Sequence, residues 1–368
     1  MSRFYEKALD HFIDISTEDA TSILAKEKAL IGLSLLIECY EQHSIPYDDL
    51  SLVALPDFTF TRNNLRWQNG FAYGCVVFLP KNGTPLIPIG FRPNCCGVIL
   101  SKINEWDGDD KSFSEKFKDV VGSHDFINPN DFNRRNHFLS ILKEENSQNY
   151  FALLHGSFSK IKSDQKNLPG LYIEKSDYWK EKVSQVQVGT NGYSFPYLIS
   201  DSANEYYELY QKQEALSLKY REVIFNDLFD YHEVLFHEIH EGLFNKSTIL
   251  LGAYASTTPF VCPLMVSPQT EVTMVKINQN LSALTKNRIS EPLYISPHGA
   301  GYELHGVKKA ANHNSEYILQ FNNDATMRTN NILDLPFCYR KNVVEEWCVT
   351  KQAGEKKTSL IPIFSTKL

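Results

Sequence analysis

Apolar residues recur at helical spacing near the start of the chain. Within the stretch 17–42, several of them fall on one face of a helix: Ile23, Leu30, Leu33 and Ile37. Residues 1–50 are therefore predicted to form an N-terminal helical segment. A later stretch, 201–244, is rich in Glu, Leu and Tyr and predicts one or two long helices.

Short apolar runs broken by Pro, Gly and Asn predict buried strands between these helices. The runs lie at 52–55, 72–79, 86–90, 149–155, 249–252, 261–265 and 271–277. The charged stretch 106–119 favours an exposed helix, and the tail predicts a short helix at 343–347 and a last strand at 360–364. Because no Gly/Ser-rich linker or internal repeat divides the chain, the pattern favours a single α+β domain over residues 1–368.

Composition narrows the classes of protein that this chain can belong to. The formal net charge is -7, so any contact with nucleic acid must come from a local basic patch. The beginning of the chain has no apolar signal core, and no apolar run is long enough for a membrane helix. We therefore expect a cytoplasmic protein that does not bind a membrane and whose 7 cysteines are free thiols.

Histidines and one cysteine pair are the candidate metal ligands. His137, His155 and His240 lie at strand ends, beside glycine or near another histidine, and Cys95-Cys96 adds soft thiolates. Their spacing matches no zinc-finger pattern, which favours a site assembled by the fold. The spacing does not choose between Cys95 and Cys96, or between His240 and His237. Each residue taken alone is also compatible with an ordinary core position.

His298 is the strongest single candidate for chemistry. It stands in the run Ser-Pro-His-Gly-Ala-Gly at 296–301, where Gly299 and Gly301 remove side chains beside it. A phosphate could then approach both the imidazole and a nest of backbone N–H groups. A histidine in such a place can serve as metal ligand, general base or nucleophile.

Taken together, the motifs resemble those of the RtcB family of RNA-splicing ligases, in the same order along the chain. The resemblance runs from about Leu55 to the C-terminal residues and is closest at 296–301, which resembles the segment holding the family's guanylylated histidine. The other similar segments are Leu-Pro-Asp at 55–57, Gly-Phe-Arg-Pro-Asn-Cys-Cys-Gly-Val at 90–98, Asn-His-Phe-Leu at 136–139, His-Gly-Ser at 155–157, the helix around 220–224, His240, and the tail at 336–344 and 360–367.

The resemblance implies one large domain with mixed or antiparallel sheets around a central metal cleft, and with flanking helices. It further implies an enzyme that uses one or two Mn²⁺ ions and GTP. The enzyme would join an RNA 3′-phosphate, or 2′,3′-cyclic phosphate, to a 5′-hydroxyl. Its partners would be RNA ends and GTP; the sequence leaves the oligomeric state open, with a monomer favoured.

The resemblance also implies roles for individual residues. His298 would become guanylylated, and Asp57 would act with it in catalysis. The implied metal ligands are Cys96 (or Cys95), His137, His155 and His240. The implied nucleotide-binding residues are Asn136, His298, Gly299, Ala300, Gly301, Tyr339 beside the guanine, and Lys367 at its edge.

The chain differs from the family at positions that bind metal or phosphate through charged side chains. Arg92 or Pro93 stands in place of the metal-loop aspartate, and an inward arginine would repel cations. Leucines at 250–251 and Tyr302 replace cations that would bind phosphate. Two alternatives therefore stand beside the ligase: a protein of the same fold that binds metal or RNA ends without ligation, and a different metal-dependent nucleotidyl transferase.

Overall fold

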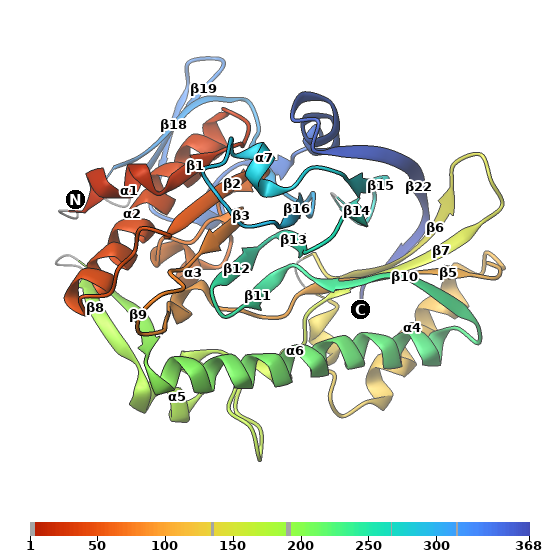
Figure 1. The fold of residues 1–368 in the computed structure, drawn as a ribbon. Coiled ribbons are helices and arrows are strands. Elements are labelled where there is room, and N and C mark those ends of the chain that lie inside the picture. The colour runs from red at the N-terminus through yellow and green to blue at the C-terminus, as the bar shows by residue number, and fades with distance from the viewer. Residues whose placement is uncertain (1–3, 134–135, 189–192, 266, 314–315) are drawn as a thin grey trace.

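The chain forms both helices and strands, with long runs of consecutive strands such as β10 to β15, in agreement with the predicted α+β class (Figure 1). The computed structural model describes all residues except 1–3, 134–135, 189–192, 266 and 314–315. Among the described strands, β1 and β2 form the one parallel pair, and the other named pairs are antiparallel. The sheets are therefore mixed or antiparallel.

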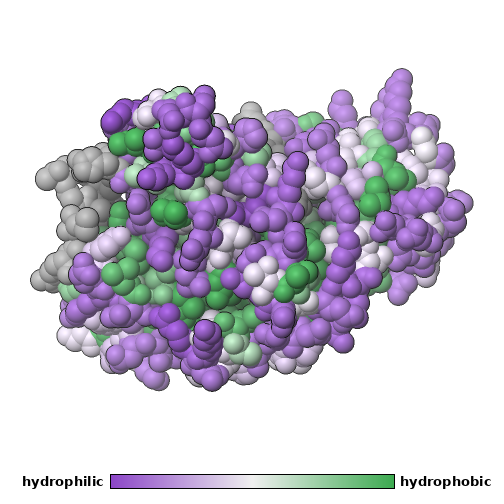
Figure 2. All heavy atoms as spheres, turned by 90° about the horizontal axis from the view of Figure 1, so that it is seen from above, coloured by the Kyte–Doolittle hydropathy of each residue, from purple (hydrophilic) through white to green (hydrophobic). Residues whose placement is uncertain are grey.

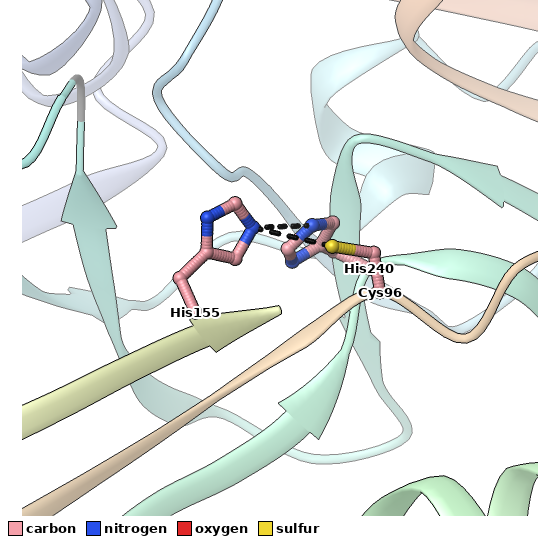
Figure 3. Close-up of side chains that lie close together, drawn as sticks. All are labelled: Cys96, His155 and His240. Carbon is pink, nitrogen blue, oxygen red and sulfur yellow. Dashed lines mark hydrogen bonds between the residues drawn. The ribbon is translucent and has the colours of Figure 1, made fainter. Parts of the chain in front are cut away.

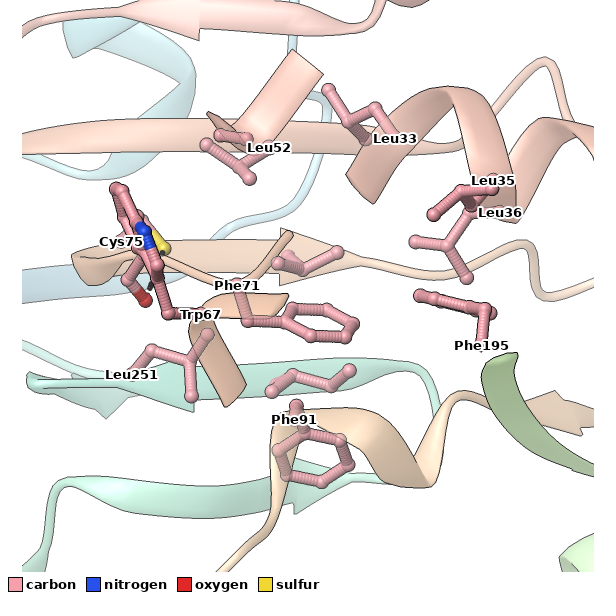
Figure 4. Packing of buried hydrophobic residues seen from close by; sticks show 14 of the residues in the cluster. Leu33, Leu35, Leu36, Leu52, Trp67, Phe71, Cys75, Phe91, Phe195 and Leu251 are labelled. Atoms are coloured by element: carbon pink, nitrogen blue, oxygen red, sulfur yellow. Dashed lines mark hydrogen bonds between the residues drawn. The ribbon is translucent and has the colours of Figure 1, made fainter. Parts of the chain in front are cut away.

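The first large sheet has five strands in the order β1-β2-β3-β12-β11. Their bounds are β1 Phe12–Asp14, β2 Ser51–Thr59, β3 Tyr73–Phe78, β12 Thr248–Leu251 and β11 Glu241–Asn245. Helix α2 (Ala20–Gln42) contributes Leu33 and Leu36 to the core that this sheet shares. Figure 4 shows Leu33 and Leu36 in the same core as Leu52 of β2 and Leu251 of β12.

The second large sheet has seven strands in the order β10-β5-β7-β6-β22-β15-β14. Their bounds are β10 His232–Ile239, β5 Gly97–Ile103, β7 Tyr150–Gly156, β6 Phe138–Glu144, β22 Gly354–Thr366, β15 Val272–Ile277 and β14 Phe260–Met265. Helices α4 (Asp110–Ser123) and α6 (Asp201–Leu228) run along it in Figure 1. Their residues Phe117 and Phe225 share a core with Ile99 and Leu154 of the sheet.

Smaller elements complete the fold. The short sheets are β13 (Ala253–Ser256) with β16 (Tyr294–Pro297), β17 (Tyr302–Leu304) with β21 (Phe337–Tyr339), β18 (Val307–His313) with β19 (Glu316–Phe321) and β20 (Thr326–Thr329), and β4 (Leu86–Ile87) with β9 (Tyr193–Ile199) and β8 (Ser184–Val188). The short helices are α1 (Tyr5–Asp10), α3 (Asn64–Gln68), α5 (Asp177–Lys182), α7 (Leu281–Leu284) and α8 (Val343–Glu345).

Most predicted elements lie where the pattern places them, with shifted ends. Helix α2 begins at Ala20 because the Asp19 carboxylate accepts the N–H groups of Thr21 and Ser22 and so caps its first turn. The N-terminal segment is not only helical, since β1 joins the first sheet. The tail strand is longer than predicted and spans β22.

The prediction of helix over 201–244 is wrong beyond Leu228. The residues that follow form β10 and β11. Strand β10 is the edge of its sheet and leaves charged Glu233 and Glu238 exposed. Exposed glutamates mixed with apolar residues are also typical of a surface helix, so pairing with β5 decided the structure here rather than the local pattern.

No described helix is long and apolar enough to cross a membrane. On the face drawn in Figure 2, hydrophilic residues predominate and hydrophobic residues form separated patches between them. This distribution is ordinary for a protein surface in water.

Backbone contact between α2 and the loop after α3 yields a stability prediction. A Cβ on Gly32 would overlap the carbonyl of Gly70, whose own φ is +79°. Both partners are backbone atoms, so Gly32→Ala is expected to lower the free energy of unfolding by about 3 kcal/mol. Gly122→Ala in α4 is the control, because its Cβ meets nothing within 4 Å and should raise helix stability by up to about 1 kcal/mol. Urea denaturation of both variants measures the contrast, and equal midpoints would contradict it.

Candidate metal and histidine site

Cys96, His155 and His240 form a buried group of potential metal ligands (Figure 3). The three residues come from neighbouring strands of the seven-stranded sheet. Cys96 immediately precedes β5, His155 lies in β7, and His240 follows β10. The register places Gly97 of β5 opposite both Gly156 of β7 and Ile239 of β10, so the three side chains meet at the same end of the sheet.

The spacing of the ligand atoms fits a single metal ion. The distance from His155 Nε2 to His240 Nε2 is 3.3 Å, and that from His155 Nε2 to Cys96 Sγ is 3.4 Å. Tetrahedral ligands at about 2.0–2.1 Å (nitrogen) and 2.3 Å (sulfur) would be separated by roughly 3.3 Å between nitrogens and 3.6 Å between nitrogen and sulfur. The chemistry also fits, because thiolate and imidazole are transition-metal ligands.

The histidines of this group are held in the neutral form that binds metal. Burial, with the neighbouring His137 and His298, keeps the pKa of His155 well below its ordinary value. Burial, with His298 and His155, does the same to the pKa of His240. A neutral imidazole keeps a lone pair on one nitrogen, so both side chains are ready to coordinate.

His137 extends the group without belonging to its tightest part. Its Nε2 lies 3.6 Å from Cys96 Sγ, while its Nδ1 lies 2.6 Å from the carbonyl oxygen of Asp131. A carbonyl can only accept, so Nδ1 carries the proton and Nε2 presents its lone pair to the thiol. The Cys96 sulfur is thus in contact with imidazoles on two sides.

The structure separates the two adjacent cysteines. Cys95 has a left-handed φ of +51°, and its side chain joins the core beside α2 and α6 rather than the metal-ligand group. Burial raises the pKa of its thiol strongly. The Arg221 guanidinium, buried in α6, donates to the carbonyls of Cys95 and Gly156 and so holds both ligand-bearing segments. Cys95 is therefore corrected from ligand to core residue.

His237 lies away from the ligand group and makes stability depend on pH. Its Nε2 accepts from Arg221 Nε at 3.4 Å, and burial together with Arg221 lowers its pKa to about 3. In the unfolded chain His237 binds a proton below pH ~6.5, whereas in the folded protein it stays neutral until the pH approaches 3. The free energy of unfolding therefore falls as the pH drops from ~6.5 towards 3.

The predicted test replaces His237 with glutamine. We expect wild type to lose up to about 3 kcal/mol more stability than His237→Gln between pH 7 and pH 4. Denaturant titrations at both pH values measure this difference, with the exposed His305→Gln as the control. Equal losses in wild type and His237→Gln would refute the assignment.

His298 lies in the same region, oriented by a buried carboxylate. Its Nδ1 lies 3.0 Å from Asp57 Oδ2, its Nε2 lies 3.1 Å from the Tyr73 hydroxyl, and its ring centre is 4.8 Å from that of His240. Asp57 and His298 are almost completely buried. Since an ionised carboxylate only accepts, Asp57 places the ring proton on Nδ1 and leaves a lone pair on Nε2. Burial raises the pKa of Tyr73 strongly, so its hydroxyl stays a donor.

The glycines after His298 act differently from the prediction. The Gly299 N–H donates to Asp57 Oδ2 at 3.0 Å, so it is not open to a phosphate. Gly299 has φ +102°, and a Cβ there would meet the Met265 backbone at 2.8 Å, while one on Gly301 would meet the Asp57 backbone at 2.5 Å. The glycines allow close backbone packing around the Asp57–His298 pair, which replaces the expected anion nest.

These groups border a cleft of about 550 Å³. Cys96, His137, His155 and His298 line it together with the predicted nucleotide-binding residues Asn136, Ala300 and Tyr339. Lys367 does not: it is exposed beyond β22 and is not among the described residues that line the cleft.

Several cleft residues were not found from the sequence. Glu241 is buried beside His240, where Arg66 Nη1 donates to it at 2.8 Å and the Asn94 amide also donates. Burial works to raise the pKa of Glu241, but Arg66 outweighs it and the pKa is lowered. The sequence signal for Glu241 as a site residue is its position directly after His240. Tyr73 lies in the run 72–79, whose pattern indicates only an apolar strand, so the sequence contains no signal for its role.

Arg92 does not repel a metal at this site. Its guanidinium pairs with Glu174 at 2.6 Å and lies over the ring of Tyr172 at 4.2 Å, and Arg92 is not among the cleft-lining residues. Leu250 and Leu251, which stand where the family has cations, are buried in β12.

No model of a known protein family matches the chain, and no curated protein matches it significantly.

Proposed function

We propose that the chain is an RNA-joining enzyme of the RtcB type, which transfers a guanylyl group from GTP through His298. One observation carries the proposal: His298, whose Nδ1 faces Asp57, lines the same cleft as Cys96 and His155 of the metal-ligand group, and its ring centre lies 4.8 Å from that of His240. A histidine oriented by a carboxylate is a competent nucleophile. The resemblance of the motifs and the α+β fold with its sheets around this cleft support the same proposal.

In the proposed first step, the Nε2 lone pair forms a bond to the α-phosphorus of GTP. The bond from that phosphorus to its bridging oxygen breaks, and pyrophosphate leaves with the electron pair. The Nδ1 proton stays between the ring and Asp57, whose charge stabilises the cationic imidazole that results. The Tyr73 hydroxyl, which donates to Nε2 at 3.1 Å, would have to turn away as this bond forms.

In the next two steps an RNA 3′-phosphate oxygen attacks the guanylyl phosphorus, and the bond to Nε2 breaks to restore His298. An RNA 5′-hydroxyl oxygen then attacks the 3′-phosphate, GMP leaves, and the hydroxyl proton passes to solvent. Cys96, His155, His240 and His137 would hold Mn²⁺, which would neutralise phosphate charge. Asn136 and Tyr339 would contact the nucleotide.

The test is the covalent intermediate itself. Wild-type protein incubated with Mn²⁺ and GTP labelled at the α-phosphate should retain label after denaturation, and a 3′-phosphate RNA should discharge it. Label should be released by acid and survive base, as expected for a phosphorus–nitrogen bond. No retained label at saturating GTP and Mn²⁺ would refute the transfer.

A second candidate function is binding of metal or RNA ends without ligation. It is favoured by the scarcity of cations: Arg62 and Arg66 are the arginines that line the described cleft, and Arg66 is paired with Glu241. Triphosphates are usually bound by several cations. This candidate predicts Mn²⁺ and RNA binding with no retained label, so the same experiment separates the two.

A further inference from the structure

The side of the cleft formed by β17 and β21 carries an aromatic wall made of Tyr302, Phe337 and Tyr339, over the buried Phe60. Tyr302 is the middle residue: its ring centre lies 4.6 Å from that of Phe337, with the ring planes at 61°, and 5.5 Å from that of Tyr339, with the planes at 40°. Tyr302 and Tyr339 are directly opposite across the two strands. The three wall residues are only half-buried, so part of each ring is open to the cleft.

Arg62 places a positive charge beside this wall. Its guanidinium carbon lies 4.7 Å from the centre of the Phe337 ring, and its side chain is exposed. The contact is a cation–π interaction, which orients the guanidinium without neutralising it. Arg62 therefore keeps its charge for a bound anion.

Few of the described residues that line the cleft carry a positive charge that could bind phosphate. Among the residues that the structure describes, the charged ones that line the cleft, other than histidine, are Arg62, Arg66 and Glu241, which sum to one net positive charge. Arg66 and Glu241 neutralise each other at 2.8 Å. A nucleic acid bound through phosphates needs several cations, whereas aromatic rings contribute about 1–3 kcal/mol per stacked base.

We propose that Tyr302, Phe337 and Arg62 form a subsite for an unpaired nucleobase of single-stranded RNA, next to the reacting end. Because the planes of Tyr302 and Phe337 are inclined at 61°, the base stacks on one of these rings and meets the edge of the other, while Arg62 binds the adjoining phosphate. A base inside a duplex is covered on both faces by its stacked neighbours, whereas an unpaired base can turn out of the stack and offer a free face to the wall. The inference rests on the proposed function for the identity of the nucleic acid, and it selects single strands over duplexes as substrates.

The position of the wall relative to His298 is consistent with this role. Tyr302 follows His298 by four residues, and Thr59 Oγ1 in β2 donates to the Tyr302 carbonyl at 3.1 Å. Asp57, which orients His298, lies in the same strand as Thr59. The stacking surface and the histidine are thus held by the same two segments. A base on Tyr302 and Phe337 leaves Tyr339 for the guanine of GTP.

The experiment measures RNA binding without GTP, by fluorescence anisotropy of a labelled single-stranded RNA with a 5′-hydroxyl end. Phe337→Ala and Tyr302→Ala should each weaken binding about tenfold or more, and Phe337→Trp should restore it. Arg62→Gln should weaken binding and lower its dependence on salt concentration. Tyr231→Ala, an exposed aromatic outside this cleft, is the matched control and should bind like wild type. A duplex of the same sequence, and a strand with an abasic end, should bind more weakly than the intact single strand.

Wild-type affinity for duplex equal to that for single strands would overturn the proposal, and so would undiminished binding by folded Phe337→Ala or no RNA binding by wild type. Circular dichroism checks that each variant is folded. Retained GMP label is scored separately, because the wall variants leave Asp57 and His298 intact. Weakened RNA binding by the wall variants together with no retained GMP label in wild type would refute guanylyl transfer but support the subsite. Retained label together with unchanged RNA binding by Phe337→Ala would support guanylyl transfer and refute the subsite.

Discussion

Replacing His298 with alanine is expected to abolish the retained GMP label, a loss of at least about 10³-fold in the rate of adduct formation. Alanine has no lone pair to form the bond to phosphorus, and no other histidine of the cleft contacts Asp57 in the described structure. Asp57→Asn should lower the rate by on the order of 10²-fold or more. Its amide is neutral, so it cannot offset the positive charge that develops on the imidazole.

The controls for this prediction are chosen near His298 in sequence or contact. His305→Ala removes an exposed histidine seven positions later and should label like wild type. Tyr73→Phe removes the hydroxyl at 3.1 Å from Nε2 and should change the rate by less than Asp57→Asn, since Tyr73 is a donor rather than an orienting anion. Full labelling of His298→Ala would show that another residue is the nucleophile.

Replacing Cys96 with alanine is expected to weaken Mn²⁺ binding by roughly 100-fold or more, because it removes the sulfur that contacts both His155 and His137. Bound metal stabilises the folded state, so the rise in melting temperature with added Mn²⁺ should also disappear in this variant. Metal content after dialysis and the shift in melting temperature are two independent readouts.

Cys95→Ala is the matched control for the metal experiment. It removes an adjacent thiol of the same chemistry, but one that lies in the core, so it should lower stability by about 1 kcal/mol or more and leave Mn²⁺ affinity unchanged. His155→Ala and His240→Ala should resemble Cys96→Ala. Equal metal affinity in the two cysteine variants would contradict the assignment of Cys96.

The sequence predicted elements well where a continuous apolar run entered a buried sheet. The strands near 52–55, 72–79 and 149–155 are examples. The helix over 17–42 was predicted instead from the helical spacing of its apolar residues. It failed at β10, whose partner decides its structure, and it did not predict the β18-β19-β20 sheet. Local patterns report whether a side chain is buried, while strand pairing depends on residues far along the chain.

The same distinction explains the candidate site. Residue type identified His137, His155, His240 and His298, because imidazole is a common transition-metal ligand and these histidines stand at strand ends, beside glycines or near another histidine. Residue type could not choose Cys96 over Cys95, since that choice depends on the direction of the backbone at φ +51°. Residue type also led to the prediction that Gly299 makes room for a phosphate, whereas its N–H donates to the Asp57 carboxylate.

The position of β22 between β6 and β15 has a consequence for biosynthesis. Of the seven strands, β22 is the last to leave the ribosome, yet it pairs on both of its sides. Until it emerges, the nascent chain exposes two strand edges whose backbone groups have no partner, and such edges invite association with other chains. Ribosomes that stall before β22 would therefore release aggregation-prone products, and this sheet is completed only after β22 has emerged.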